Sequence, residues 1–598
     1  MKENSRLDSK DVAKILNEMA DFLEIKGENQ YKIRAYQRAA QELTSLNENL
    51  YDLWQNEALT EINGVGEGLA AAIDEIFSRG RLEELEELKR ELPDGINDLL
   101  AIQGLGPKRA RKLFYELGVG DLEDLNRAIE AGEVQAVSGF GEKTCENLQA
   151  GIKKYREFQK YYSIDEAEMI VSKLDDILKQ HADIIEEYRA AGGYRRRKDL
   201  LQELYFLLAT AEGNQKLLQR RLTEEPELKS ISADNRQHSP ENLYEVGNYL
   251  YFQWQDSIEV NFVLVPPKNF VEALQNLTGS RAHNKNLQEF CAEQGYDLTS
   301  DGLFKKSRCK VDEQEETEIE FSAEREFYKH LDLDFIIPEL REARGEIKAA
   351  YKGELPVSPV RSDINGDLHV HSNYSDGTHS MEEMVKSAAE KGYEYIAITD
   401  HSVSLRIADG LSVKQLQEQG DEIEKLNRDY SEITVLRGVE VDILTSGELD
   451  YSSEILAELD VVIASVHSGF NQSKAEMTAR ITRAMENPGV DIIGHPQGRL
   501  LKSREAYEVN MDEVIDKAAE TGTCLEINAS PSRLDVDDEM TRKAARAGVK
   551  LAVNTDAHNP RELEQIRFGL DVARRGWLEK DDIINTFSTE ELIEFLSN

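Results

Sequence analysis

Two histidines separated by a single residue, His369 and His371, are the first side chains whose types and spacing suggest a reaction centre. Alternate residues of a short strand point to one face, so both imidazoles can bind one metal ion, with Asp376 in the following turn. One such pair is weak evidence. Downstream, however, apolar runs typical of strands repeatedly end in residues of metal-ligand type: His401, Glu440, His467, His495, Asp556 and His558. The pattern predicts a metal centre assembled from several strand ends.

Helical patterns follow these apolar runs, which indicates repeated strand-helix units with parallel strands. Such units close into a barrel, and the carboxyl ends of the strands meet at the end where these folds carry out their chemistry. The alternative is that scattered polar residues cap unrelated strands. It accounts for any one histidine, but not for a series at the same place in successive units.

The composition sets limits on the class of protein. The 598 residues include 72 Lys and Arg against 115 Asp and Glu, so several domains and an acidic surface are expected. A uniformly basic nucleic-acid binder is excluded, whereas DNA contacts through backbone amides and a few arginines are not. Four dispersed cysteines without a Cys-x-x-Cys pair predict reduced, structural thiols. Because no signal peptide or membrane-spanning run is evident, a soluble cytoplasmic protein is expected.

A glycine pattern repeats in the first part of the chain. Three times, an apolar residue, one further residue, glycine, an apolar residue and a second glycine precede a helical segment. The glycines permit a sharp turn close to a phosphate, and the amides of the next helix face that anion. One copy is also typical of a plain turn between helices, but three favour helix-hairpin-helix motifs that bind the DNA backbone. The glycines are Gly64, Gly66, Gly104, Gly106, Gly139 and Gly141.

From about Asp363 to its end, the chain resembles the PHP (polymerase and histidinol phosphatase) domain, a distorted barrel with a three-metal phosphoesterase site. Imidazole and carboxylate ligands suit manganese, zinc or iron, and the family favours manganese. Arg499 and Arg533 are candidates for gripping a substrate phosphate, with a structural ion pair as the alternative for each. The resemblance implies one metal at His369, His371, Glu440 and Asp556, a second at Glu440, His467 and His495, and a third at Asp376, His401 and His558.

The glycine repeats, together with the segments 29–40, 192–198, 278–284 and 335–342, resemble a bacterial family X DNA polymerase, to which a PHP domain is typically appended. This implies a multidomain α/β chain with helical helix-hairpin-helix N-terminal domains, a nucleotidyltransferase-like α+β palm and thumb, and a C-terminal distorted (β/α)7 barrel. The implied parts are an end-binding domain (1–90), a fingers-like domain (91–160), a palm (161–270), a thumb (271–343), a linker that lets the two halves move (344–362) and the PHP domain (363–598).

The palm departs from this family at its three metal-binding aspartates. Glu203 and Tyr205 stand at the first two positions and Asn261 at the third. Phosphoryl transfer needs carboxylates that fix metal ions, which tyrosine and asparagine do not replace. The palm is therefore interpreted as a polymerase fold that has lost nucleotidyl transfer. Arg195 and Arg196 are candidates for binding phosphate, with a solvated charge run as the alternative.

These observations favour a metal-dependent phosphodiesterase of DNA repair, a 3′-5′ exonuclease on gapped or broken DNA, in which Glu440 bridges two metal ions. The first alternative is an active gap-filling polymerase, which the missing aspartates oppose. The second is a non-catalytic scaffold for DNA ends, which the complete ligand set opposes. DNA is the expected partner, no membrane contact is expected, and the chain is expected to be monomeric.

Overall fold

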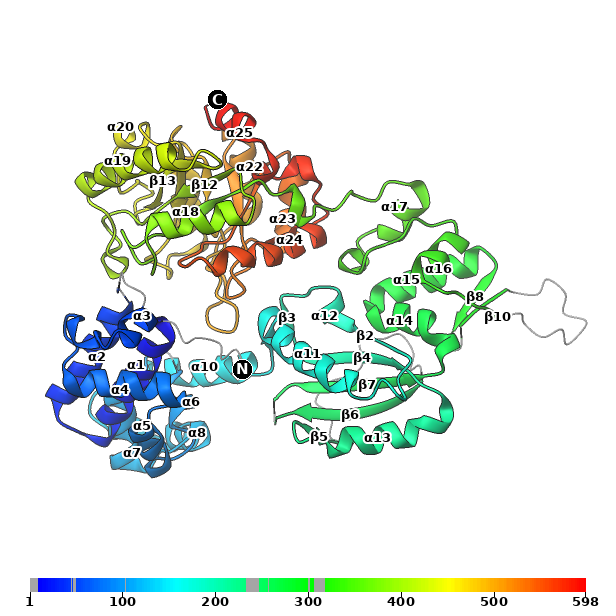
Figure 1. The fold of residues 1–598 in the computed structure, drawn as a ribbon, viewed down its shortest axis with the longest axis horizontal. Helices are drawn as coiled ribbons and strands as arrows, with labels where there is room; N and C mark the ends of the chain where they lie inside the picture. The colour runs from blue at the N-terminus through cyan, green and yellow to red at the C-terminus, as the bar shows by residue number, and fades with distance from the viewer. Residues whose placement is uncertain are drawn as a thin grey trace, which may run out of the picture.

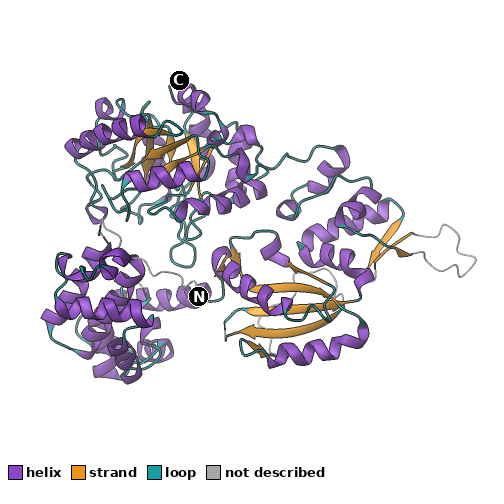
Figure 2. Ribbon diagram, viewed as in Figure 1, coloured by secondary structure: helices purple, strands orange, loops and turns teal. Residues whose placement is uncertain are grey.

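The computed structural model describes residues 9–44, 46, 50–102, 104–232, 247–255, 257–299, 302–305 and 318–597. Figure 1 shows a helical N-terminal part, a palm built around a sheet, a mainly helical thumb with a small sheet at its edge, and a C-terminal barrel. Among the described residues, the strands lie in the last two parts and the N-terminal part is helical, as Figure 2 shows. None of the described helices combines the length and apolar character needed to cross a membrane.

One hydrophobic core joins the two N-terminal domains expected at 1–90 and 91–160. Its buried residues run from Val12 to Ile152, and α1 packs against α2 and α5 as well as against α7 of the second expected domain. The helices are α1 (Ser9–Lys26), α2 (Gln30–Thr44), α3 (Leu50–Gln55), α4 (Glu67–Arg79), α5 (Glu83–Glu91), α6 (Ile96–Leu100), α7 (Pro107–Leu117), α8 (Leu122–Glu130), α9 (Glu133–Ala136) and α10 (Glu142–Phe158).

The palm contains a mixed five-stranded sheet in the order β2-β4-β7-β6-β5. Its central strands β4 and β7 run parallel and are buried throughout, which suits their apolar sequences. The strands are β2 (Glu187–Ala191), β4 (Glu203–Ala209), β5 (Leu228–Ser230), β6 (Asn248–Trp254) and β7 (Glu259–Val265), with β1 (Tyr162–Ser163) and β3 (Leu200–Leu201) paired beside them and the helices α11 (Ile164–Lys179), α12 (Gly192–Arg195) and α13 (Gln215–Glu224).

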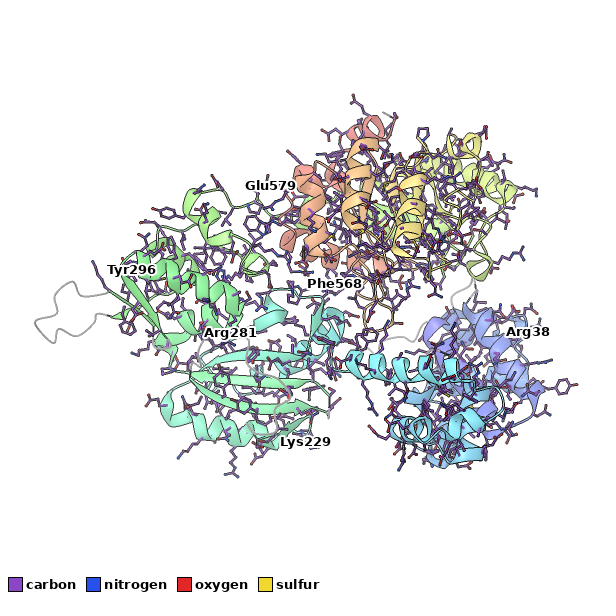
Figure 3. The ribbon with its side chains drawn as sticks, turned by 180° about the vertical axis from the view of Figure 1, so that it is seen from behind. Arg38, Lys229, Arg281, Tyr296, Phe568 and Glu579 are labelled. Carbon is purple, nitrogen blue, oxygen red and sulfur yellow. The ribbon has the colours of Figure 1, made fainter. Side chains whose placement is uncertain are left out.

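The thumb extends into the linker expected at 344–362. Ile347 and Ala350 of α17 belong to the buried core of the thumb. The extended residues that follow contact the barrel, because Val357 N donates to Glu579 Oε1 at 2.9 Å and Pro359 O accepts from Arg574 Nε at 2.9 Å. Figure 3 labels Glu579 on the barrel. The structure thus shows a bound connection rather than the free linker expected there. Thumb elements are α14 (Phe270–Thr278), α15 (Arg281–Glu293), β8 (Tyr296–Thr299), β9 (Gly302–Lys305), β10 (Glu318–Ile319), α16 (Glu324–His330) and α17 (Glu346–Lys352).

Seven parallel strands, arranged in sequence order, form the C-terminal barrel. The first and last strands meet, since Val370 bridges Ala557 and His371 N donates to Ala557 O at 2.9 Å. This nearly closed ring confirms the predicted (β/α)7 barrel. Its strands are β11 (Gly366–Val370), β12 (Tyr395–Ile398), β13 (Thr434–Asp442), β14 (Val461–Ser465), β15 (Ile492–Ile493), β16 (Cys524–Asn528) and β17 (Leu551–Asn554), and its helices are α18 (Met381–Glu390), α19 (Val413–Asp429), α20 (Ser453–Leu456), α21 (Lys474–Ala484), α22 (Met511–Thr521), α23 (Asp538–Arg546), α24 (Ile566–Arg575) and α25 (Thr589–Leu596).

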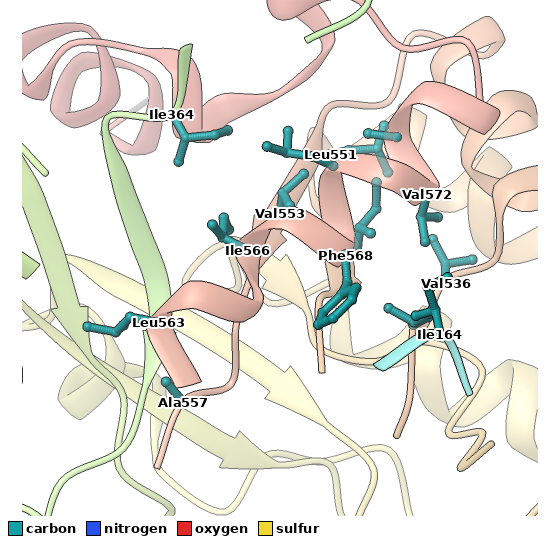
Figure 4. Packing of buried hydrophobic residues seen from close by; sticks show 14 of the residues in the cluster. Ile164, Ile364, Val536, Leu551, Val553, Ala557, Leu563, Ile566, Phe568 and Val572 are labelled. Carbon is teal, nitrogen blue, oxygen red and sulfur yellow. The ribbon is translucent and has the colours of Figure 1, made fainter. Parts of the chain in front are cut away.

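The palm and the barrel pack against each other. Ile164 of the palm belongs to the same buried cluster as Val536 and Phe568 of the barrel, and Figure 4 shows it beside Val536. Arg197 Nε lies 2.6 Å from Asp571 Oδ2 across this interface. Apolar burial and an ion pair therefore join the two parts.

Candidate metal centre and nucleic-acid interface

The strand ends of the barrel bring all nine predicted ligands together around Glu440. This residue lies on β13 and is 1% exposed. Its Oε1 atom is 3.2 Å from His467 Nε2 and 3.0 Å from His495 Nε2. Its Oε2 atom lies close to a ring nitrogen of three further histidines: His369 (3.4 Å), His371 (3.6 Å) and His401 (2.8 Å). One carboxylate thus stands at the middle of five imidazoles.

Two aspartates complete the centre. Asp556 Oδ1 is 3.1 Å from His371 Nε2, and Asp376 Oδ1 is 3.2 Å from His558 Nε2 and 3.6 Å from His401 Nε2. The side chain of Asp376 is 34% exposed, whereas that of His371 is fully buried. The centre is therefore accessible from the side on which Asp376 lies.

Buried ring nitrogens that lie near carboxylate oxygens without forming an aligned hydrogen bond indicate that this donor set fits metal ions. They include both ring nitrogens of His371, Nε2 of His369 and Nδ1 of His401. Such atoms are costly unless something binds them, and neutral imidazoles are good ligands for divalent transition metals. Three groups have ligand atoms within 4.8 Å of one another: His371, Asp376, His401 and His558; His369, His371 and Asp556; and His401, Glu440 and His467. Relative to the implied sets, His371 and His401 each join one additional group, whereas Glu440 is absent from the group that corresponds to the first set and His495 from the group that corresponds to the second.

Burial and neighbouring charges set the protonation states of the ligand side chains. Burial and the neighbouring imidazoles of His558 and His401 lower the pKa of His371 to about 4, so its ring is neutral near pH 7. Burial alone would raise the pKa of Glu440, but His467, His369 and His401 hold it well below its usual range. His371 thus has the neutral form that binds a metal. The neighbouring carboxylates outweigh burial and raise the pKa of His369, His401 and His467, so a metal ion that binds these three displaces protons.

The buried carboxylate of Glu526, which the sequence analysis missed, contacts two of these ligand histidines. Glu526 Oε1, on β16, is 2.7 Å from His369 Nδ1, and Glu526 Oε2 accepts from His495 N at 2.8 Å. A carboxylate on the second ring nitrogen fixes the tautomer and orientation of a ligand histidine. The signal was present, because the apolar run 524–528 also carries an acidic residue on a strand.

Two of the ligand residues have unusual backbone conformations. His495 has φ 31° and Asp556 has φ 56°, a region that residues other than glycine rarely adopt. Strained backbone of this kind clusters at functional sites, where surrounding structure holds it in place.

The two arginines predicted to grip phosphate differ in position. Arg533 Nε lies 3.5 Å from Asp556 Oδ2, and its Nη1 is buried without a partner. Arg499 instead lies 2.8 Å from Asp199 Oδ2 in the palm, which corresponds to the ion-pair alternative. Only Arg533 is thus placed at the metal centre.

Both candidate arginines of the palm form ion pairs with glutamates of the thumb. Arg195 Nη2 pairs with Glu324 Oε2 at 2.5 Å, and Arg196 Nε pairs with Glu342 Oε1 at 2.8 Å. Arg196 is 3% exposed. The structure therefore places both side chains in ion pairs between palm and thumb, with Arg196 buried and Arg195 22% exposed.

The three residues at the aspartate positions of the palm lie next to one another. Tyr205 on β4 pairs in register with Asn261 on β7, and Asn261 Nδ2 donates to Glu203 Oε2 at 2.9 Å. The side chains are buried. Tyr205 thus stands where the resemblance implies the second carboxylate, and the Asn261 amide, which donates to Glu203, stands where it implies the third.

The six predicted glycines form the expected turns. Gly64, Gly104 and Gly139 have φ of 78°, 86° and 96°, which glycine adopts without strain. Gly66, Gly106 and Gly141 directly precede α4, α7 and α10, and a Cβ added at any of them would meet no atom within 4 Å. Arg109 Nη1 donates to Gly104 O at 2.8 Å. Each turn therefore offers an open helix N-terminus, the arrangement that binds a phosphate.

A ligand-rich centre at the carboxyl ends of a seven-stranded barrel, joined to helix-hairpin-helix motifs, a palm and a thumb, defines a family X DNA polymerase with a PHP domain. Family models agree: a helix-hairpin-helix domain matches residues 8–82, a SAM-like helix-hairpin-helix tandem 96–154, the DNA polymerase beta thumb 273–342 and the PHP domain 367–530. The predicted resemblance is confirmed.

Comparison with individual relatives identifies the family within this class. It is 36% identical over 588 residues to "DNA polymerase/3'-5' exonuclease PolX" of Bacillus subtilis (strain 168), covering 98% of this chain and 99% of the relative. The chain belongs to this PolX family. The barrel alone also matches a "Probable phosphatase" of Thermoanaerobacter sp. (strain X514), 32% identical over 235 residues, which cover 37% of this chain and 89% of the relative.

Proposed function

We propose that the barrel is a metal-dependent phosphodiesterase that removes nucleotides from the 3′ ends of gapped or broken DNA. The observation that carries this proposal is the buried Glu440 carboxylate, which lies within 3.6 Å of ring nitrogens of five histidines. The Bacillus subtilis relative carries 3′-5′ exonuclease in its name, and the barrel relative is named a probable phosphatase. Hydrolysis of a phosphate ester is common to both names.

Three divalent metal ions, with manganese favoured over zinc or iron, are proposed at the nine ligands. When bound, such ions polarise phosphate oxygens and lower the pKa of water. Glu440 would be shared by two of the predicted ligand sets, and Glu526 would fix the orientation of His369. The free Nη1 of Arg533 is placed to donate to a phosphate oxygen, which orients the ester at the centre.

The same proposal assigns no nucleotide addition to the palm. Asn261 Nδ2 donates to Glu203 Oε2, and Tyr205, two residues after Glu203 on β4, pairs in register with Asn261 on β7. Two of the three carboxylates that fix metals in this reaction are replaced, so the charge developing on the phosphates has no counterion. The helix-hairpin-helix turns and the remainder of the palm then serve to hold DNA.

Product analysis on 5′-end-labelled gapped duplex tests both the exonuclease proposal and the assignment of an inactive palm. With Mn²⁺ the protein shortens the labelled strand stepwise from its 3′ end, and a chelator stops the reaction. With Mg²⁺ or Mn²⁺ and all four dNTPs, no product longer than the starting strand appears. Absence of cleavage with manganese, zinc and iron defeats the exonuclease proposal, and template-directed extension at a rate typical of the family defeats the assignment of an inactive palm.

A further inference from the structure

The loop that follows the ligand His495 extends from the barrel to the palm. We name residues 496–507 the bridging loop; in Figure 1 it projects from the barrel towards β3 and α11. Arg499 Nη2 lies 2.8 Å from Asp199 Oδ2, and Lys502 Nζ lies 2.6 Å from Glu166 Oε2. Both carboxylates belong to the palm, so two ion pairs attach the bridging loop to it.

On the barrel side, Arg499 holds the segment that carries Arg533. Its Nε donates to Arg533 O at 3.0 Å, and its Nη2 donates to Leu534 O. Its backbone N donates to Asp535 Oδ2 at 3.2 Å. One guanidinium thus contacts two successive carbonyl groups of the barrel and one carboxylate of the palm.

Arg533 in turn faces the metal centre. Its Nε is 3.5 Å from Asp556 Oδ2, and its buried Nη1 has no partner. Arg499 contacts the carbonyl groups of residues 533 and 534, whose amides both donate to Ser530 O, so a shift of Arg499 is expected to change the segment from which the Arg533 side chain extends.

Asp199 is well placed to fix Arg499. Its side chain is 16% exposed and receives two arginines from the barrel, Arg499 on Oδ2 and the buried Arg575 on Oδ1. Removing this carboxylate leaves the palm end of Arg499 without its counter-charge in a largely buried site, which favours a different side-chain position.

We infer that Asp199 of the palm is a positioning residue for the hydrolytic centre of the barrel, acting through Arg499 on Arg533. This inference rests on the proposed phosphodiesterase function. Asp199 touches no reacting group itself. Its consequence is that the barrel reaches full activity only with the palm in place, even on a substrate too small to contact the palm.

Hydrolysis of bis(p-nitrophenyl) phosphate with Mn²⁺ by the full-length protein tests the inference. Asp199→Ala is expected to lower kcat/KM by about ten- to hundredfold, the effect typical of groups that orient a metal site from outside. Adding Asp199→Ala to Arg533→Ala is expected to cause no further loss, because both changes remove the same phosphate contact. A residue that only stabilises the fold would instead give losses that multiply.

Arg567→Ala is the matched control. Arg567 Nη1 lies 2.7 Å from Glu168 Oε2 across the same palm-barrel interface, but the residue has no contact with the bridging loop or with Arg533. It is 52% exposed, so its removal leaves the core unchanged. This variant is expected to retain the full rate.

A full rate in Asp199→Ala, or multiplying losses in the double variant, would overturn the inference while leaving the exonuclease proposal intact. If Asp199→Ala does not fold, Arg499→Gln removes the same link from the barrel side and is expected to show the same loss; a full rate there also overturns it. Absence of any metal-dependent hydrolysis by the unmodified protein, on this diester and on DNA, would defeat the proposed function and the inference with it.

Discussion

The hydrogen bond between Glu526 and His369 shows how single residues adjust the metal centre. Glu526 is fully buried, and its pKa lies below the usual range because the charge and hydrogen bond of His369 outweigh the effect of burial. Glu526→Gln keeps the shape of the side chain but removes its charge. We expect metal affinity to fall by about ten- to hundredfold, as measured by calorimetric titration with Mn²⁺.

The control for this change is Glu418→Gln, which alters an exposed carboxylate on α19. It is expected to leave the titration unchanged. Equal affinity in Glu526→Gln and the unmodified protein would mean that the ligand histidines are held in place without Glu526.

At the scale of elements, substitutions in the glycine turns are expected to weaken DNA binding without affecting folding. Gly66 and Gly106 have ordinary extended backbone, and an added Cβ meets no protein atom. We therefore expect Gly66→Ala with Gly106→Ala to leave the melting temperature unchanged. Affinity for gapped duplex should fall by about ten- to hundredfold per blocked phosphate contact, measured by fluorescence anisotropy, since an amide-phosphate hydrogen bond contributes about 1.5 to 3 kcal/mol.

Gly213→Ala is the matched control for these turns, because Gly213 lies in the palm and a Cβ there also meets nothing within 4 Å. Unchanged affinity in the turn variants would show that DNA does not approach these helix ends. Hydrolysis of a small phosphodiester is expected to remain normal in all of them.

A buried ion-pair group joins palm and thumb. Burial raises the pKa of Glu324, but Arg341 and Arg195 outweigh it and lower the pKa to about 2. Because this value lies below that of an unfolded glutamate, about 4.3, the stabilisation is present above pH 4.3 and disappears as the pH falls towards 2. We expect Glu324→Gln to lower the free energy of unfolding by about 3 kcal/mol at pH 7 and by much less near pH 2.

Differential scanning calorimetry of the full chain from pH 7 to pH 2.5 measures this effect as a shift of the thumb transition. Glu354→Gln, at an exposed position of the same part, is expected to leave the transition in place. A shift for Glu324→Gln that stays constant over the whole pH range would contradict the role given to its charge.

The strand ends could be predicted from the sequence because a ligand-type residue at the end of an apolar run is a local signal. The barrel and the collection of its nine ligands at one end follow from that signal. Glu526 was missed because its strand ends in Asn528 rather than in a histidine. The partners of Arg499 and Arg195 depend on contacts between parts far apart in sequence, and local spacing does not indicate which carboxylate a guanidinium will meet. Helix α17 was missed because its charged residues resemble a linker.

At the scale of the whole molecule, one chain holds two phosphate-handling folds that differ in the state of their sites. The palm keeps its sheet but has Tyr205 and Asn261 where the resemblance implies aspartates, whereas each of the nine predicted ligand positions of the barrel carries a His, Asp or Glu. The net charge of −43 also becomes understandable, because the proposed DNA contacts use backbone amides at helix ends. We expect the salt dependence of DNA affinity to be shallower than for a lysine-rich binder, as measured by anisotropy from 50 to 200 mM salt. A steep dependence would show that unidentified basic side chains carry the binding.

Whether DNA is hydrolysed in the barrel is tested most directly by comparing Glu440→Ala with Glu203→Gln on 5′-end-labelled gapped DNA with Mn²⁺. Glu440→Ala removes the carboxylate between five histidines, and shortening from the 3′ end is expected to fall by several orders of magnitude. Glu203→Gln removes the remaining carboxylate at the aspartate positions of the palm and is expected to shorten DNA at the normal rate. Near-normal shortening by Glu440→Ala, or its loss in a folded Glu203→Gln variant, would contradict a hydrolytic centre in the barrel.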